Sequence, residues 1–205
     1  MAAARSFHRV GVLAPTEADL VRGIVDGQRW AADALYELLY PTVARSLQRV
    51  LHEPGPDYED LVQATFERII LGLVKHRAES VLSLNAWASG VASHLALDSL
   101  RSRIRQRRLF RGGGPEVNGS IDVAAASAGE RHVDARRQLA VVCAVLADMK
   151  PKLAEAVVLH DLVGHDLAEI AAMTHVSMTA AQSRLVRGRK ELLRRVQLRL
   201  DREGR

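Results

Sequence analysis

The pattern that most constrains this chain is a helical apolar period, a break and a second helical period, all between residues 167 and 190. Leu167, Ile170 and Ala171 stand at i, i+3 and i+4, so they share one face of a short helix. So short a helix is not stable alone, because its apolar face must be buried against a neighbour. A second helix close in the sequence is therefore expected to cover it.

The second helix is expected from about Met178. Val176 is placed to fill the angle between the two helices, and Ser177 is suited to cap the second. Ala181 and Leu185 turn inward, while the solvent side carries the residue types that read the major groove and contact phosphates. These outward residues are Gln182, Arg184, Arg187, Arg189 and Lys190. The pattern predicts a helix-turn-helix; a helical hairpin whose basic face is merely solvated is the alternative.

The charge of the chain is concentrated in two segments, although its net value is only +5. Residues 101–111 carry six Arg and no acidic residue, and residues 184–199 carry seven Lys or Arg against one Glu. Such segments indicate a polyanionic partner, and nucleic acid is the polyanion that suits a helix-turn-helix. A membrane surface is the rival partner, but neither an aromatic belt nor a lipidation signal lies near these segments.

The composition favours helices packed on helices and gives no sign of catalysis. Only 4% of the residues are aromatic, and alternating β-branched runs are missing, which predicts an all-α fold. Neither a secretory signal nor a run of ~20 apolar residues is present, so a cytoplasmic protein is expected. The single Cys143 lies in an apolar run and is expected to be a buried, inert thiol. The eight His share no metal-ligand spacing with it, so we expect no enzyme, metal or cofactor.

Two helical domains on a tether are expected. Residues 1–15 form a leader, residues 16–111 one domain, residues 112–129 a flexible linker and residues 130–205 a second domain. The linker contains consecutive Gly and a Pro, which cannot remain helical. A flexible linker of roughly 18 residues lets the domains sit about 25 Å apart.

The expected helices follow from caps and apolar periods. Thr16 and Asp19 have the form of a capping box that opens a helix to about Val25. The next helix runs from about Trp30, with Leu38 among its inward residues, and Pro41 permits a kink or a fresh start within it. Further helices are expected over residues 58–75, 83–110, 130–147 and 151–162.

Three motifs resemble those of bacterial sigma factors of the extracytoplasmic-function (ECF) group of the sigma-70 family. The run Asp57-Tyr-Glu-Asp-Leu-Val-Gln-Ala-Thr-Phe66 is similar to the region-2 signature Asp-x-Glu-Asp-Leu-x-Gln-Glu-x-Phe. Residues 87–101 look like the helix that opens the promoter −10 element, and residues 155–190 look like region 4, which reads the −35 element. The resemblance covers nearly the whole chain and implies a region 2-like domain and a region 4-like helix-turn-helix domain joined by a flexible linker.

The resemblance implies a factor that directs core RNA polymerase to specific promoters, and it implies three sets of binding residues. The polymerase-binding set is Asp57, Asp60, Leu61, Gln63, Phe66 and Glu67. The set for the −10 element is Trp87, His94, Asp98, Arg101, Arg103 and Arg105. The set for the −35 element is Ser177, Thr179, Ala180, Gln182, Ser183, Arg184, Arg187, Arg189 and Lys190. Core polymerase, promoter DNA and an anti-sigma factor are the implied partners, without a small-molecule substrate or membrane insertion.

The chain departs from the family pattern in the promoter-melting helix and in the turn. Where the family shows Trp-x-Tyr-Arg-Ile-Ala-Arg-Asn, residues 87–94 read Trp-Ala-Ser-Gly-Val-Ala-Ser-His. Stacking contributes ~1–3 kcal/mol per base, so the loss of a ring and two positive charges predicts weaker promoter opening. The alternative function is a sigma-like protein that binds an anti-sigma factor or polymerase without efficient opening. His175 replaces the usual turn Gly, and His tolerates positive φ better than most residues.

Overall fold

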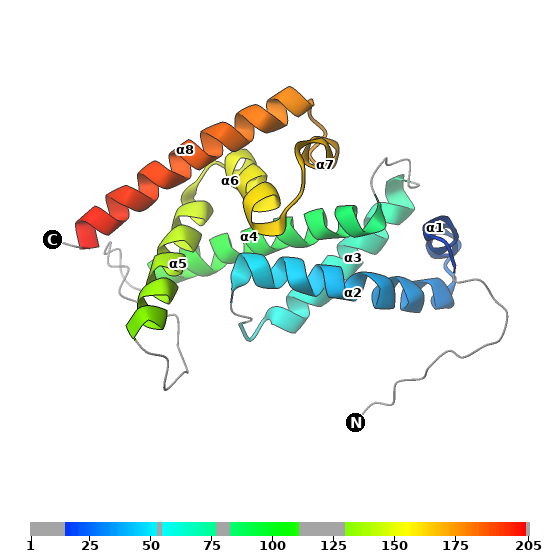
Figure 1. The fold of residues 1–205 in the computed structure, drawn as a ribbon. Coiled ribbons are helices and arrows are strands. Elements are labelled where there is room, and N and C mark those ends of the chain that lie inside the picture. The colour runs from blue at the N-terminus through cyan, green and yellow to red at the C-terminus, as the bar shows by residue number, and fades with distance from the viewer. Residues whose placement is uncertain (1–14, 53–54, 77–82, 111–129, 204–205) are drawn as a thin grey trace.

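The computed structural model describes residues 15–52, 55–76, 83–110 and 130–203 and shows helices without strands in those ranges (Figure 1). Residues 1–14 of the expected leader (1–15) and the whole expected linker (112–129) lie outside the described residues. The elements in chain order are α1 (Glu17–Val25), α2 (Arg29–Leu51), α3 (Tyr58–His76), α4 (Leu84–Phe110), α5 (Glu130–Asp148), α6 (Pro151–Val157), the π-helix η1 (Val158–Val163), α7 (Leu167–Met173) and α8 (Met178–Glu203).

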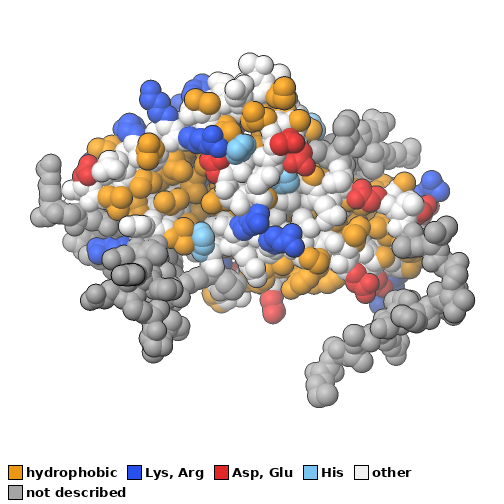
Figure 2. Space-filling view, in the orientation of Figure 1, with side chains coloured by type: hydrophobic (Ala, Val, Ile, Leu, Met, Phe, Trp, Pro, Cys, Tyr) orange, Lys and Arg blue, Asp and Glu red, His pale blue; other side chains and the backbone are white. Residues whose placement is uncertain are grey.

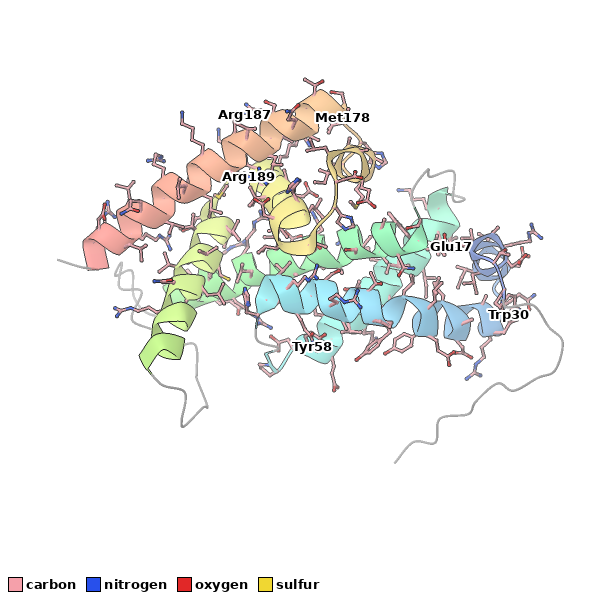
Figure 3. All side chains as sticks on the ribbon, viewed as in Figure 1. Glu17, Trp30, Tyr58, Met178, Arg187 and Arg189 are labelled. Carbon is pink, nitrogen blue, oxygen red and sulfur yellow. The ribbon has the colours of Figure 1, made fainter. Side chains whose placement is uncertain are left out.

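The predicted capping box at the start of α1 is confirmed. The backbone N–H of Asp19 donates to Thr16 Oγ1 at 3.2 Å, and the Thr16 N–H donates to the Asp19 carboxylate at 3.1 Å. Glu17 of the same helix makes a contact distant in sequence, because its carboxylate accepts a hydrogen bond from the backbone N–H of Leu84 at 3.1 Å (Figure 3). The first helix therefore caps α4, which begins 67 residues later.

Pro41 neither ends nor restarts α2, which runs through it as one helix of 23 residues. The buried side of α2 follows Ala31, Leu35, Leu39 and Val43, each four residues after the last. The prediction that Leu38 faces inward is wrong, since 40% of this residue is exposed. It is turned by about 100° from Leu39 on the helical wheel, which places it beside the core-facing stripe.

Small side chains let α4 pack closely on its neighbours. Ala88, Ala92 and Ala96 are fully buried at four-residue spacing, and α2 lies alongside α4 (Figure 1). On another side, the Trp87 ring covers Gly72 of α3, where an added Cβ would lie 2.6 Å from the ring. Short side chains at a helix contact reduce the distance between helix axes. The composition of α4 therefore sets how tightly the N-terminal half is built.

The helix expected over residues 151–162 changes its hydrogen bonding midway. Pro151 occupies its first turn as predicted, but the chain passes from α6 into η1 after Val157. At the end of η1, the N–H groups of Gly164 and His165 both donate to the Leu159 carbonyl, at 3.0 and 2.9 Å. Gly164 has φ +98°, a conformation that favours glycine. A sequence period does not distinguish this π-helical turn from an α-helical one.

The two halves of the chain pack against each other in one arrangement (Figure 1). A single buried apolar cluster contains Leu35, Leu97 and Ile69 from the N-terminal half, and Leu146 and Val158 from the C-terminal half. The separation of about 25 Å that a flexible linker permits is therefore not the arrangement seen. None of the described helices is long and apolar enough to cross a membrane.

Gly188 provides a test of the packing between α6 and α8. An added Cβ there would lie 2.7 Å from Val157 Cγ2 and 2.8 Å from the Leu153 carbonyl oxygen. Because a backbone atom cannot move aside cheaply, we expect Gly188→Ala to lower the free energy of unfolding by about 1–3 kcal/mol, despite the better helix propensity of Ala. Urea denaturation followed by circular dichroism measures the change. The exposed Lys190→Ala on the same helix is the control and should stay within about 0.5 kcal/mol of the wild type.

Candidate nucleic-acid interface

The helix-turn-helix predicted from the sequence is formed by α7 and α8. Asp166 and Glu169 make a capping box at the start of α7, with bonds of 2.8 and 3.1 Å between side chains and backbone N–H groups. His175, which replaces the usual Gly in the turn, has φ +51°, a conformation that His tolerates better than most residues. The Ser177 hydroxyl caps α8 by accepting from the Ala180 N–H at 3.2 Å. Local hydrogen bonds thus fix the start of each of the two helices.

A small apolar cluster holds the two helices at their angle. Ile170 of α7 is 1% exposed and Ala181 of α8 is fully buried, and Leu159 of η1 completes the contact. Val176 packs against this cluster, as expected for the residue in the turn. Leu185 is 4% exposed and joins the larger core. The inward positions of α8 therefore lie where the apolar period placed them.

The outward face of α8 displays most of the predicted −35 set, and Lys and Arg side chains line its outer side (Figure 2). The exposed members are Ser177, Thr179, Gln182, Ser183, Arg187, Arg189 and Lys190, whereas Ala180 and Arg184 are partly buried. Gln182 and Arg184 are two residues apart and therefore about 200° apart around the helix. These two side chains cannot both face one strip of base edges. Val186, 58% exposed beside Gln182, is an apolar member of this face that charge patterning missed.

Arg189 is held by an acidic partner within the chain. It lies on the side of α8 that faces α6, whereas Arg187 lies on the outer side (Figure 3). Its Nε donates to Asp161 Oδ2 of η1 at 2.9 Å, its Nη2 bonds to Asp161 Oδ1, and Nη2 also lies 3.0 Å from His160 Nδ1. The guanidinium lowers the pKa of Asp161, with partial burial acting in the opposite direction. Arg189 is thus paired with a carboxylate, whereas Arg187 Nε donates only to the Ser183 carbonyl of its own helix, at 3.2 Å.

The distal part of the basic segment also makes internal contacts. Arg195 donates to the Asp148 carbonyl at 3.0 Å, and Arg199 donates to the Asp148 carboxylate at 2.7 Å. Arg195 is in addition paired with Glu191 at 2.5 Å. These bonds fasten the end of α8 to α5. Three of the seven basic residues between 184 and 199 therefore stabilise the fold, and the basic surface is smaller than the sequence count implies.

The predicted polymerase-binding residues lie on and before α3. Asp57, Asp60, Gln63 and Glu67 are exposed, and the Gln63 amide donates to the Glu67 carboxylate at 3.0 Å. Leu61 is partly buried, and Phe66 is only 7% exposed. The period of α3 turns the Phe66 ring into the core, so among the predicted residues this ring is not part of the exposed surface.

Aromatic rings on α2 extend the surface of α3. The centroid of Tyr36 lies 4.5 Å from that of Phe66 and 5.3 Å from that of Tyr40. Tyr36 and Tyr40 are 45% and 41% exposed. Neither ring is among the residues predicted from the sequence, although their spacing of four residues next to the inward Leu35 and Leu39 is the pattern of an outward pair.

The predicted −10 residues lie along α4, where the C-terminal half contacts part of the helix. Asp98 links His94 and Arg101, with contacts of 3.3 and 3.0 Å. Arg103 lies over Gly55, and Arg105 is exposed. One buried nitrogen of Arg101 and one of Arg103, Nη2 in each case, have no hydrogen-bond partner among the described residues. The Trp87 ring, packed on Gly72, is partly buried.

Metal binding and thiol chemistry find no support in the described part of the chain. No group of three or more His, Cys, Asp or Glu side chains there could hold a metal ion. Burial raises the pKa of the Cys143 thiol to about 11, which leaves almost no thiolate at neutral pH. Cys143 is partly buried rather than fully buried as expected, and its thiol is protonated at neutral pH.

Comparison with known families gives two matches, one in each half. Residues 35–106 match sigma-70 region 2, and residues 143–192 match sigma-70, region 4. The second match contains α7, the turn and the first part of α8. The first contains α3 and most of α2 and α4.

Individual relatives agree with these matches. The chain is 32% identical over 135 residues to the ECF RNA polymerase sigma factor SigC of Mycobacterium tuberculosis, covering 66% of this chain and 68% of that protein. It is 30% identical over 166 residues to the ECF RNA polymerase sigma factor SigE of Mycolicibacterium smegmatis, covering 80% and 58%. The solved structure of CnrH in complex with the cytosolic domain of CnrY has a similar fold, with TM-score 0.50, 22% identity and coverage of 86% and 94%.

A pH-dependent contact at His94 can be measured directly. Its Nδ1 lies 3.4 Å from the Glu155 carboxylate of α6, and this bond raises the pKa of His94, with Asp98 adding to the effect and partial burial opposing it. Because the pKa of His94 is higher in the folded state, protonated His94 stabilises the fold fully below about pH 6.5. This stabilisation decreases as the pH rises through the pKa that His94 has in the folded state. We expect His94→Gln to cost about 0.2–1 kcal/mol at pH 6 and less at pH 8. Urea midpoints at both pH values measure this, and Glu155→Gln should give the same trend; equal losses at both pH values would contradict it.

Proposed function

The chain belongs to the sigma-70 family of RNA polymerase sigma factors, in its ECF group. On this premise we propose which of its surfaces contacts each partner during transcription initiation. It is a DNA-binding initiation factor that directs core polymerase to promoters. The observation that supports this assignment of surfaces most directly is the exposed, basic outer face of α8 in a complete helix-turn-helix. The alternative of a sigma-like protein without efficient promoter opening is not favoured by these relationships.

We assign −35 recognition to the outer face of α8. Gln182 stands near the start of this helix, where side chains of a recognition helix reach base edges, and its amide can pair with adenine. Arg187 and Lys190 lie further along the same face and suit phosphate contacts. Arg184, on the flank, suits a phosphate better than a base. The remaining polar members, Ser177, Thr179 and Ser183, complete this surface.

The α4 helix is our proposed −10 surface. Trp87 offers a ring for stacking, and Arg101, Arg103 and Arg105 offer positive charge near the displaced strand. The buried guanidinium nitrogens of Arg101 and Arg103 without a hydrogen-bond partner favour a role for an incoming acceptor. An unsatisfied buried donor costs about 1–3 kcal/mol, and a phosphate oxygen would remove this cost after a small side-chain rotation.

Further proposals concern the protein partners of this chain and the compartment in which it acts. Asp60, Gln63 and Glu67, flanked by the rings of Tyr36 and Tyr40, form our proposed docking surface for core polymerase. Rings next to polar groups are typical of the centre of an interface. The structure of CnrH contains the cytosolic domain of CnrY, and we propose an anti-sigma partner for this chain too. We further propose that the factor acts in the cytoplasm, where polymerase and promoters are.

Substitution of the α3 surface should separate docking from folding. Asp60→Ala with Gln63→Ala removes two exposed side chains, so the far-ultraviolet circular dichroism and melting temperature should stay unchanged. Loss of polar contacts at an interface is expected to weaken core polymerase binding by about tenfold. Fluorescence anisotropy of the labelled factor with core polymerase measures the affinity. Gln197→Ala with Asp201→Ala, which removes one exposed amide and one exposed carboxylate at the end of α8, is the control for a general charge effect. An unchanged affinity in the α3 variant would exclude this surface.

Run-off transcription tests the function, and a matched pair of Arg variants tests the −35 assignment. Purified factor and core polymerase should give promoter-dependent transcripts from genomic DNA.

Arg187→Ala should weaken promoter binding about equally for all sequences and reduce the salt slope by about one, because a phosphate contact is lost. Arg189→Ala removes the same charge from a group already paired with Asp161, so it should change the salt slope less. Equal salt slopes for the two variants would contradict the assignment, and no transcript with any promoter would contradict the function.

A further inference from the structure

An ion pair lies at the edge of the proposed −35 surface. Arg189 follows Gln182 by seven residues of α8, so the two side chains leave the helix within about 20° of each other. The Arg189 side chain is 49% exposed on this flank of the helix. A cation at this place can contact a phosphate of bound DNA. Arg189 is nevertheless bonded to Asp161, a residue of η1 that lies 28 positions earlier in the chain.

The contact between Arg189 and Asp161 is bidentate. Arg189 Nε donates to Asp161 Oδ2 at 2.9 Å, and Arg189 Nη2 donates to Asp161 Oδ1. Pairs of this geometry are among the strong hydrogen-bonded ion pairs of proteins. The bonds from Arg189 lower the pKa of Asp161, so its carboxylate is charged at neutral pH. A phosphate that approaches this guanidinium therefore also meets a negative charge, which reduces the attraction.

His160 competes for the same carboxylate. Its Nδ1 lies 2.8 Å from Asp161 Oδ1 and 3.0 Å from Arg189 Nη2. A neutral imidazole with a bare Nδ1 accepts from Arg189, whereas a protonated imidazole donates from Nδ1 to Asp161 and repels the guanidinium. Nδ1 therefore makes only one of the two bonds at a time. An imidazole changes its charge between about pH 5 and 8, so the bonding of Asp161 depends on pH in this range.

The elements packed against η1 contribute charged side chains that are bonded to other groups. These elements are α2, α4, α6 and α7. Their charged contacts around η1 join Arg49 to the Val163 carbonyl, Glu155 to His94, and Glu169 to His165. Within the described part of the chain, Asp161 and Arg189 are the charged side chains that contact His160.

We propose that Asp161 limits the affinity of α8 for DNA by pairing with Arg189, and that protonation of His160 weakens this pairing. The proposal rests on the proposed function, since it concerns regulation of the −35 surface. Asp161 is then a positioning residue, because it acts on DNA through Arg189. A cation without a carboxylate partner releases a counterion when a phosphate binds. Removal of Asp161 should therefore strengthen DNA binding, and binding should also strengthen as the pH falls.

Asp161→Asn tests the proposal, because it removes the carboxylate charge and keeps the shape of the side chain. The probe is a fluorescein-labelled, mixed-sequence DNA duplex of about 30 base pairs, since phosphate contacts do not depend on sequence. Anisotropy with the full-length factor over a series of KCl concentrations gives the affinity and the salt slope. We expect Asp161→Asn to bind about three- to tenfold more tightly at low salt, with a salt slope steeper by about one. Asp161→Glu keeps the charge and should stay within about twofold of the wild type.

A double-mutant cycle separates an action through Arg189 from a general effect of charge. In an Arg189→Ala background, Asp161→Asn should change the affinity by less than about twofold, because no guanidinium is left to release. Asp201→Asn removes an equal charge from the exposed end of α8 and should change the affinity as little. Circular dichroism of each variant shows whether its helices are intact.

The pH profile of DNA binding tests the role of His160. At constant salt, the affinity of the wild type should fall by about twofold or more from pH 6 to pH 8, and His160→Gln should remove most of this change. Seven other histidines are present in both proteins, so the difference between the two profiles measures the contribution of His160.

The outcomes distinguish this proposal from the proposed function. The proposal is overturned if Asp161→Asn binds the duplex no more tightly than the wild type, or if the gain persists in full without Arg189. Equal pH profiles for the wild type and His160→Gln overturn the role of His160. If run-off transcription fails while Asp161→Asn still binds duplex DNA more tightly through Arg189, the proposed function is contradicted and the regulation by Asp161 is supported.

Discussion

Close packing around α4 is the interaction on which the rest of the structure depends. Ala88, Ala92 and Ala96 are fully buried, and α2 lies along the helix, with Ser46 Oγ 2.9 Å from Ser89 Oγ. The same helix contacts α3, α5 and the segment from α6 to α7. Interiors are packed at the density of organic crystals, so a larger residue on such a face cannot be absorbed without displacing a neighbour. One helix thus carries the proposed −10 surface and holds the two halves together.

Ion pairs within the chain determine how many of its Lys and Arg side chains are available to bind DNA. Arg189 is bonded to Asp161, and Arg195 and Arg199 are bonded to Asp148, so these cations fasten α8 to the domain. Exposed cations with no internal carboxylate are the ones that release counterions when a phosphate binds. The outer face of α8 around Arg187 and Lys190 fits this description. A count of charges along the chain therefore overestimates the binding surface.

The segment between α6 and α7 shows how a local irregularity positions a distant contact. The π-helical turn ends at Gly164, where a positive φ reverses the chain and two N–H groups share the Leu159 carbonyl. This geometry leaves His165 directed at Ser89 and places Val163 where Arg49 can reach its carbonyl. Helix C-termini leave carbonyls unpaired, and here a side chain from the other half satisfies one of them. The turn and the contact between the halves are thus parts of one arrangement.

The sequence alone determined the all-helical fold, the capping box at Thr16, and the helix-turn-helix with its inward Ala181 and outward Arg187. These features depend on hydrogen bonds and periodicity within a few residues, which a sequence displays directly. Only the tertiary structure decided that Phe66 is covered by Tyr36, that Arg189 is paired, and that Ser89 meets a residue 76 positions away. Such contacts depend on how separate helices approach one another, and the period of a single helix carries no information about the partner that its face will meet.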